Sequence, residues 1–263
     1  MKILKLSFLL FSLCFFAACI DTEELIDLNA DGSGQYSLSM DMGKLIEMAS
    51  SMGGDKGTPK KTKEKIDTLI YFKDAVAASD KLSADEKAIF KDGQCKIKFD
   101  EANSEMKIVL SCPFKDMNTL AVVKKDLPGL LDKLGLMDKA TGKRKNKSEL
   151  SEMGGDGDLA NAVNPSDKYY NFSAVPGKIS YSIPDKESFK KLVANDSIMQ
   201  MMQQSALMMG DMTSTTIIKL PSPVKSVSNP KAVLSADKKT VTIKTIVTNM
   251  MEKPEEAEYS IEY

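Results

Sequence analysis

Short segments in which apolar and polar residues alternate recur along the chain, and several of them come in pairs joined by turn-forming residues. One pair, 24–28 and 36–42, flanks the Asn-, Asp- and Gly-rich segment 29–34. Another pair lies on either side of Pro176-Gly177, and a hairpin centred on that dipeptide pairs Ala174 with Ile179 and Phe172 with Tyr181. Alternation with a period of two is typical of strands that bury one face, and these turn residues favour hairpins. The pattern therefore predicts antiparallel hairpins as the basic units of the fold.

Segments with helical spacing separate these hairpins. Ser83 and Glu86 stand three residues apart before an apolar run, which is the sequence signature of a capping box at a helix start. Residues 116–136 predict two short helices, the second of which restarts at Pro128. Helices of this length and spacing fit one layer packed on the sheet that the hairpins form.

The C-terminal third begins with a helix and continues in strands. Asp185 is placed to cap a long helix that ends near Met209. The later segments with strand character are 215–220, 224–227, 232–234, 240–247 and 259–263. The predicted fold class is α+β: a mainly antiparallel sheet built from hairpin–helix units, with helices on one face and an all-strand C-terminal part.

Residues 1–19 have the anatomy of a bacterial lipoprotein leader. Two lysines open it, residues 6–18 are apolar, and two alanines precede Cys19. Small residues at those positions allow the Cys19 thiol to be acylated and the preceding bond to be cut. We therefore expect a signal peptide over 1–18, lipidation at Cys19, and anchoring of the mature chain to a membrane. The alternative is an ordinary secretory leader followed by a chance cysteine.

The residues after Cys19 bear on localisation. Ile20 stands where an Asp would resemble an inner-membrane retention signal, so we expect the outer membrane, on its periplasmic or cell-surface face. Three acidic residues follow within the next four positions. They loosely match a surface-export signal of Bacteroidetes-type lipoproteins, and they fit a solvated acidic spacer at least as well.

Cys95 and Cys112 lie in two alternating segments on either side of Asn103-Ser104. If a hairpin is centred on that dipeptide, Cys95 faces Cys112, and the apolar residues between them pair on the same face. An even pair of cysteines in an exported chain predicts a disulfide. The alternative is a pair of buried free thiols.

Composition excludes several kinds of chemistry. The chain has no histidine, which rules out Ser-His-Asp and Cys-His catalysis and every His-containing metal site. Without the leader lysines, 34 basic residues stand against 37 acidic ones, and Arg144 is the one arginine, so we expect no nucleic-acid partner. The loop 27–32 has half of a calcium-loop pattern, but Leu38 stands where a bidentate Glu is needed, so it predicts a turn. We expect no enzymatic activity, no cofactor and no metal.

We expect residues 19–263 to form a single α+β domain with flexible, polar insertions near 53–65 and 139–167. Methionines crowd the predicted helix 198–212. This spacing is typical of a Met-rich core face, and it also fits an adaptable groove for an apolar ligand. The weak candidates for ligand binding are Met199, Met202, Met209 and Met212.

The segment from Cys19 to Tyr36, with Leu28-Asn29-Ala30-Asp31-Gly32-Ser33-Gly34, and the tail with Ile218-Lys219-Leu220-Pro221 and Leu234-Ser235-Ala236-Asp237 resemble uncharacterised Bacteroidetes-type envelope lipoproteins. More remotely, these segments resemble LppM-like envelope lipoproteins. The resemblance implies an α+β envelope lipoprotein and carries over no catalytic residue. We expect a lipid-anchored protein with a non-enzymatic binding or structural role, whose protein partner is unknown. The alternative is a carrier of an apolar or lipid ligand that uses 198–212.

Overall fold

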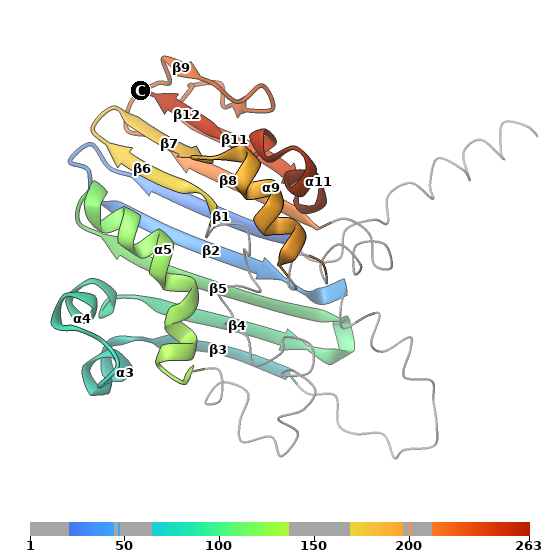
Figure 1. The fold of residues 1–263 in the computed structure, drawn as a ribbon. Coiled ribbons are helices and arrows are strands. Elements are labelled where there is room, and N and C mark those ends of the chain that lie inside the picture. Colours follow the sequence, from blue (N-terminus) through green and yellow to red (C-terminus); the bar gives the residue numbers. More distant parts are fainter. Residues whose placement is uncertain (1–20, 45–46, 48–64, 137–168, 197–199, 201–211) are drawn as a thin grey trace, which may run out of the picture.

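Two sheets and a layer of helices make up the fold, which Figure 1 shows in a computed structural model that describes residues 21–44, 47, 65–136, 169–196, 200 and 212–263. The larger sheet has eight strands in the order β10-β11-β8-β1-β2-β5-β4-β3, and the smaller has four in the order β6-β7-β12-β9. The chain therefore belongs to the α+β class, as predicted. The predicted leader 1–18 and the insertion 139–167 lie outside the described residues, and so does 53–65 except Lys65.

The larger sheet is antiparallel except where β1 and β8 pair in parallel. Its strands are β1 (Asp21–Leu28), β2 (Gly34–Asp41), β3 (Lys65–Tyr71), β4 (Gln94–Asp100), β5 (Glu105–Phe114), β8 (Thr213–Lys219), β10 (Val233–Leu234) and β11 (Thr240–Ile246). β1 and β2 form the predicted hairpin. In its turn, Gly32 has a φ of +85°, and the Asp31 carboxylate accepts bonds from the backbone and hydroxyl of Ser33.

One face of this sheet is buried and the other meets solvent, as period-two alternation requires. A row of paired positions on the buried face runs from Ile243 across Thr216, Glu24, Leu38 and Leu110 to Cys95. Its members are apolar apart from Thr216 and Glu24. The opposite face carries charged residues such as Lys96, Lys107 and Lys244, all exposed.

Helices α3 (Lys73–Ala78), α4 (Ala84–Phe90) and α5 (Met117–Lys133) cover the buried face near β3, β4 and β5 (Figure 1). The predicted capping box is present, because Ser83 Oγ accepts from the Glu86 amide and Glu86 Oε2 accepts from the Ser83 amide. The two short helices predicted over 116–136 are wrong: α5 is continuous and contains Pro128. Burial of Leu120, Leu127 and the other core-facing residues of α5 offsets the loss of one backbone hydrogen bond at Pro128.

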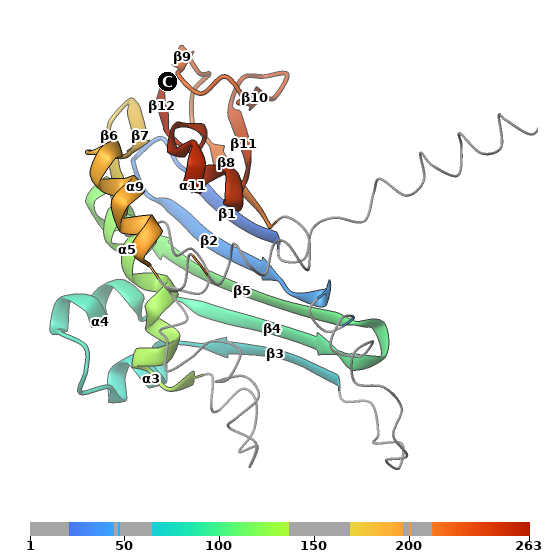
Figure 2. The same cartoon turned by 45° about the vertical axis from the view of Figure 1, so that its right-hand side comes forward.

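The smaller sheet packs beside α5 and closes the core over β1, β8 and β11 (Figures 1 and 2). Its strands are β6 (Asn171–Val175), β7 (Lys178–Ser182), β9 (Ser226–Val227) and β12 (Tyr259–Glu262). The predicted register of the β6–β7 hairpin is confirmed: Ala174 pairs with Ile179, and Phe172 with Tyr181. Buried side chains of both sheets form one continuous core.

Two predictions for the C-terminal third are wrong. The helix capped by Asp185 is α9 (Lys186–Asn195), which ends well before Met209, because the chain turns extended at Asp196. The last part is also not all strand, since α11 (Val247–Glu252) and a 3₁₀ turn follow β11. The Val247 amide bonds the Met212 carbonyl, one position beyond the Ile246–Thr213 pair of the β8–β11 ladder, and the helix that follows places Met250 in the core.

The β4–β5 hairpin forms, but its predicted register is wrong by two residues. Cys95 pairs with Leu110, and Ile97 with Ile108. The loop has four residues instead of two: Asp100 accepts bonds from the amides of Ala102 and Asn103 and so stabilises a 3₁₀ turn. Ser104 completes the loop with a φ of 50°. This longer loop moves the centre of the hairpin and separates the two cysteines.

Candidate functional site

A buried ion pair joins the larger sheet to the helix layer. Lys124 of α5 donates to Glu24 of β1 at 2.5 Å, and the side chains are 4% and 11% exposed. Both residues stand on the apolar faces of their elements, because Glu24 precedes Ile26 by two strand positions and Lys124 lies four residues after Leu120. Each charge therefore enters the core together with the apolar residues around it, and each offsets part of the desolvation cost of the other.

Aromatic rings of the smaller sheet cover the lysine. The Lys124 ammonium lies 4.9 Å from the centroid of the Tyr181 ring and 5.5 Å from that of Phe172. Tyr181 stacks in turn on Tyr170, with ring centroids 4.4 Å apart. A cation over an aromatic face is attracted by the ring, most strongly where water is excluded. Lys124 therefore connects three elements: strand β1, helix α5 and the β6–β7 hairpin.

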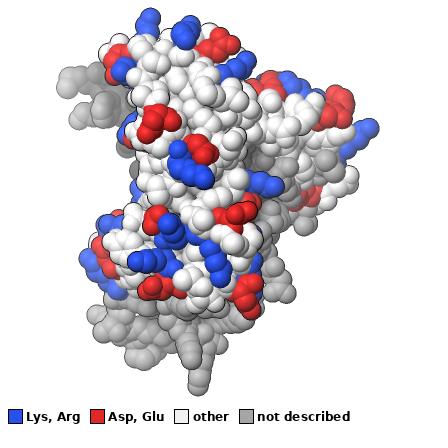
Figure 3. Space-filling model, turned by 90° about the vertical axis from the view of Figure 1, so that its left-hand side faces the viewer, with Lys and Arg blue, Asp and Glu red and all other residues white. Residues whose placement is uncertain are grey.

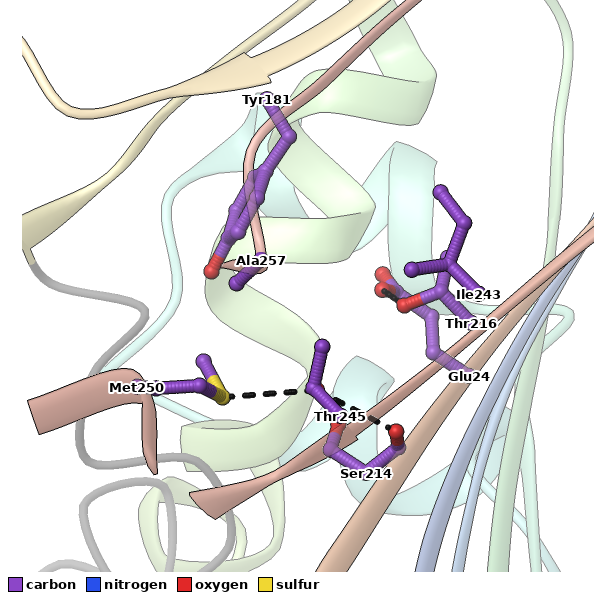
Figure 4. Close-up of a pocket in the computed structure, with 8 residues that line it drawn as sticks. All are labelled: Glu24, Tyr181, Ser214, Thr216, Ile243, Thr245, Met250 and Ala257. Atoms are coloured by element: carbon purple, nitrogen blue, oxygen red, sulfur yellow. Dashed lines mark hydrogen bonds between the residues drawn. The ribbon is translucent and has the colours of Figure 1, made fainter. Parts of the chain in front are cut away.

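A small cavity lies on the other side of Glu24 (Figure 4). Its volume is about 20 Å³, which suits one or two ordered waters. The lining residues are Glu24, Tyr181, Ser214, Thr216, Ile243, Thr245, Met250 and Ala257. Hydroxyl groups on its wall are engaged within the protein: Thr216 bonds Glu24 Oε2 at 3.5 Å, and Thr245 bonds the Ser214 carbonyl at 3.3 Å. This cavity is far smaller than the several hundred Å³ of a typical ligand pocket.

The chemistry of the cluster favours a structural use. A lysine acts as a nucleophile or base only as the free amine, whereas a carboxylate partner and aromatic faces stabilise the ammonium form. The Glu24 carboxylate is bonded through both oxygens, to Lys124 and to Thr216. The arrangement can therefore fix the position of α5 and the β6–β7 hairpin against β1.

The acidic residues after Cys19 do not by themselves predict this pair. Glu24 belongs to that acidic segment, although its alternation with Ile26 and Leu28 puts it on the buried face. Lys124 stands between Leu120 and Leu127 on the apolar face of its helix. Two opposite charges on the apolar faces of two elements are a signal for a buried pair, but nothing in the sequence showed that these faces meet.

The predicted disulfide is absent: Cys95 and Cys112 are both free and buried. Cys112 stands diagonally from Cys95 across the ladder, a relationship in which side chains start about 7–8 Å apart. A disulfide needs Cα atoms within about 7 Å and Cβ atoms closer still, so bridging would require backbone movement. Burial raises the pKa of the Cys95 thiol to about 12, and burial with the nearby Asp92 raises that of Cys112 to about 12. The pair thus matches the buried-thiol alternative.

The other candidate residues are mostly not described. Cys19, Met199, Met202 and Met209 lie outside the described residues. Met212 is described and is buried in the core, where its carbonyl accepts from the Val247 amide. Among the described residues there is no cluster of His, Cys, Asp and Glu suited to a metal ion. No helix in the described ranges is long and apolar enough to span a membrane.

Comparison with known proteins gives one distant similarity. The chain matches no protein-family model and no curated protein. Among solved structures, it is similar to the folded domain of LppM from Mycobacterium tuberculosis, determined by NMR. The two share 10% sequence identity and a TM-score of 0.33, over 94% of this chain and 91% of that one. The predicted likeness to LppM is supported only as a distant structural similarity, which assigns neither a family nor a function.

Proposed function

We propose that the chain is a lipid-anchored envelope lipoprotein, held in the outer membrane through Cys19, whose folded domain has a non-enzymatic structural or protein-binding role. The proposal rests on the short distance in sequence between Cys19 and the first described strand. The described sheet begins with Asp21 of β1, two residues after Cys19. Cleavage before Cys19 would therefore remove residues 1–18 and leave every described strand and helix intact.

The non-enzymatic part of the proposal is supported by the state of the buried ion pair. Glu24 and Lys124 neutralise one another, and the aromatic rings of Tyr181 and Phe172 cover the ammonium group. A charged pair of this kind fixes the relative position of secondary-structure elements. A rigid domain held close to a membrane suits the display of a surface to a protein partner.

The carrier of an apolar or lipid ligand is a weaker alternative. Of its candidate residues, Met212 is described, and its side chain is part of the core. The cavity beside Glu24 is about one water across, and an acyl chain needs a far larger volume. No specific observation in the described residues favours this alternative.

The lipid anchor is tested by substitution of two cysteines in parallel. Cys19→Ser should abolish incorporation of labelled palmitate and release the protein from the membrane fraction, because the thiol that carries the lipid is gone. Cys14→Ser is the matched control within the leader: bulky Leu13 precedes Cys14, so it is a poor acylation site, and labelling should be unchanged. Undiminished labelling of the Cys19→Ser protein would contradict the proposal.

A further inference from the structure

We infer that one end of the larger sheet faces the lipid surface, and that, among the described residues, the β4–β5 hairpin is the part of this end nearest to the headgroups. This inference rests on the proposed anchor at Cys19. It adds an orientation to that proposal: the strands stand end-on to the bilayer instead of lying along it.

The chain between the proposed lipid site at Cys19 and the sheet is short. Asp21 is already in β1, and two residues span at most about 7 Å. β1 is paired on both sides, to β2 and to β8, so its first residue cannot move independently of the sheet. The lipid therefore holds a fixed point of the folded domain close to the membrane.

Several other strand ends lie at the same end of the sheet as Asp21. Registers align Asp21 with Thr213 at the start of β8, and with Asp41 at the end of β2. They also place the end of β11, the start of β5, the end of β4 and the start of β3 on this side of the sheet. The turn of the β1–β2 hairpin lies at the other end, about 26 Å away along the eight residues of β1.

Of the described elements at this end, the β4–β5 hairpin reaches furthest. Asp41 is paired with both Asp21 and Lys107, so these three residues lie side by side across the sheet. β5 extends two residues further toward this end, to Glu105, which lies about 7 Å beyond Lys107. The four-residue β4–β5 loop adds to this length, and the hairpin extends past the start of β1 in both ribbon views (Figures 1 and 2). The β4–β5 hairpin therefore projects toward the membrane beside the anchor.

The chemistry of the hairpin tip specifies the contact. Lys65 pairs with Asp100 at 3.3 Å, and Lys98 with Glu105 at 2.7 Å. Glu101, Ala102 and Asn103 in the loop are exposed. A polar, ion-paired tip meets hydrated headgroups and does not enter the hydrocarbon, so the lipid on Cys19 supplies the affinity and the tip sets the orientation.

The opposite end then faces away from the membrane. Figure 3 shows the molecule from that side: basic and acidic side chains are interspersed over both halves of this face, with uncharged surface between them. A partner protein that approaches from outside the bilayer would meet this end first.

Fluorescence quenching by lipids measures the orientation directly. Ala102 in the β4–β5 loop and Ala30 in the β1–β2 turn are both exposed alanines in turns, at opposite ends of the sheet. Each is replaced by cysteine (Ala102→Cys, Ala30→Cys) and labelled with bimane. The unsubstituted protein, treated in the same way, gives the background fluorescence from any labelling of Cys95 and Cys112. The purified acylated proteins are placed in vesicles of phosphatidylethanolamine and phosphatidylglycerol that contain headgroup-region nitroxide lipid.

We expect quenching at Ala102 to exceed that at Ala30 several-fold, and Cys19→Ser versions to show quenching at neither position. Equal quenching at the two positions, or stronger quenching at Ala30, would overturn the orientation. Mass spectrometry of the same samples separates the two proposals. A chain without lipid on Cys19 would contradict the anchor, whereas an acylated chain with the wrong quenching pattern would contradict the orientation alone.

Discussion

Glu24 and Lys124 are separated by 100 residues in the sequence and by 2.5 Å between their charged atoms, in the core where the two sheets and α5 meet. Taking one buried charge out of such a pair leaves the other without compensation, which costs far more than the pair contributes as a unit. The pair therefore makes the relative position of β1 and α5 specific, whatever its net effect on stability.

We predict that Lys124→Met or Glu24→Leu alone lowers the free energy of unfolding by about 3–5 kcal/mol. The double variant Glu24→Leu/Lys124→Met should lose much less stability than the sum of the losses in the two single variants, because neither charge is left in the core. Chemical denaturation of the four proteins gives the coupling energy. Lys133→Met is the matched control on the same helix: its partially exposed pair with Glu86 is screened by solvent, so its loss should cost far less stability than the loss of Lys124. Equal losses for Lys124→Met and Lys133→Met would contradict the account.

The free thiols give a prediction at alkaline pH. Burial holds the pKa of Cys95 and Cys112 near 12 in the folded protein, against 9.0 for an ordinary thiol. The unfolded chain therefore loses these protons first, and stability falls as pH rises from about 9 toward 12. The loss approaches about 1.4 kcal/mol per thiol for each pH unit above 9.

Melting curves of the wild type and of Cys95→Ala/Cys112→Ala, at pH 8 and at pH 10.5, isolate this effect from the titration of Lys and Tyr. The advantage of the wild type over the variant should shrink at the higher pH. Labelling of the unreduced protein should detect two thiols only after unfolding. A constant difference in melting temperature would contradict the raised pKa values of the two thiols, and the absence of reactive thiols in the unfolded chain would show that the cysteines are bridged in solution.

The capping box of α4 gives a prediction at acidic pH. Hydrogen bonds from the Ser83 amide, the Ser83 hydroxyl and Lys133 lower the pKa of Glu86 to about 2 from 4.5. The stabilisation is therefore complete above about pH 4.5 and is lost as pH falls through 2. Glu86→Gln should be less stable than the wild type at pH 6, and the difference should nearly vanish at pH 2.

The neighbouring Asp85→Asn variant is the control, because the Asp85 carboxylate takes no part in the capping box. Its difference from the wild type should change less between pH 6 and pH 2. Thermal unfolding followed by circular dichroism is sufficient for the comparison. If Glu86→Gln behaves like Asp85→Asn over this range, the capping box does not contribute as described.

Local signals predicted those parts of the fold that depend on local chemistry. The β6–β7 register followed from the tight turn at Pro176-Gly177, and the capping box from Ser83 and Glu86. The β4–β5 register was wrong because Asp100 stabilises a longer loop than Asn103-Ser104 alone suggests. Centring the hairpin on its turn dipeptide gives the correct register for β6–β7 and a wrong register for β4–β5. The error therefore lies in the assumed length of the β4–β5 loop and not in the prediction of the strands.

The parts that could not be predicted depend on contacts between distant segments. The parallel pairing of β1 with β8 joins residues about 190 positions apart, and no turn specifies it. The approach of Lys124 to Glu24 likewise depends on how α5 crosses the sheet. The continuity of α5 through Pro128 is decided by tertiary burial, which a local rule about proline does not include.

The central claim, a lipid anchor at Cys19, is tested most directly by intact-mass and peptide mass spectrometry of the protein extracted from membranes with detergent. The account predicts a chain that begins at Cys19 and carries a diacylglyceryl group on its sulfur, with residues 1–18 removed. A membrane-extracted chain that retains residues 1–18, or that begins at Cys19 with an unmodified thiol, would contradict it.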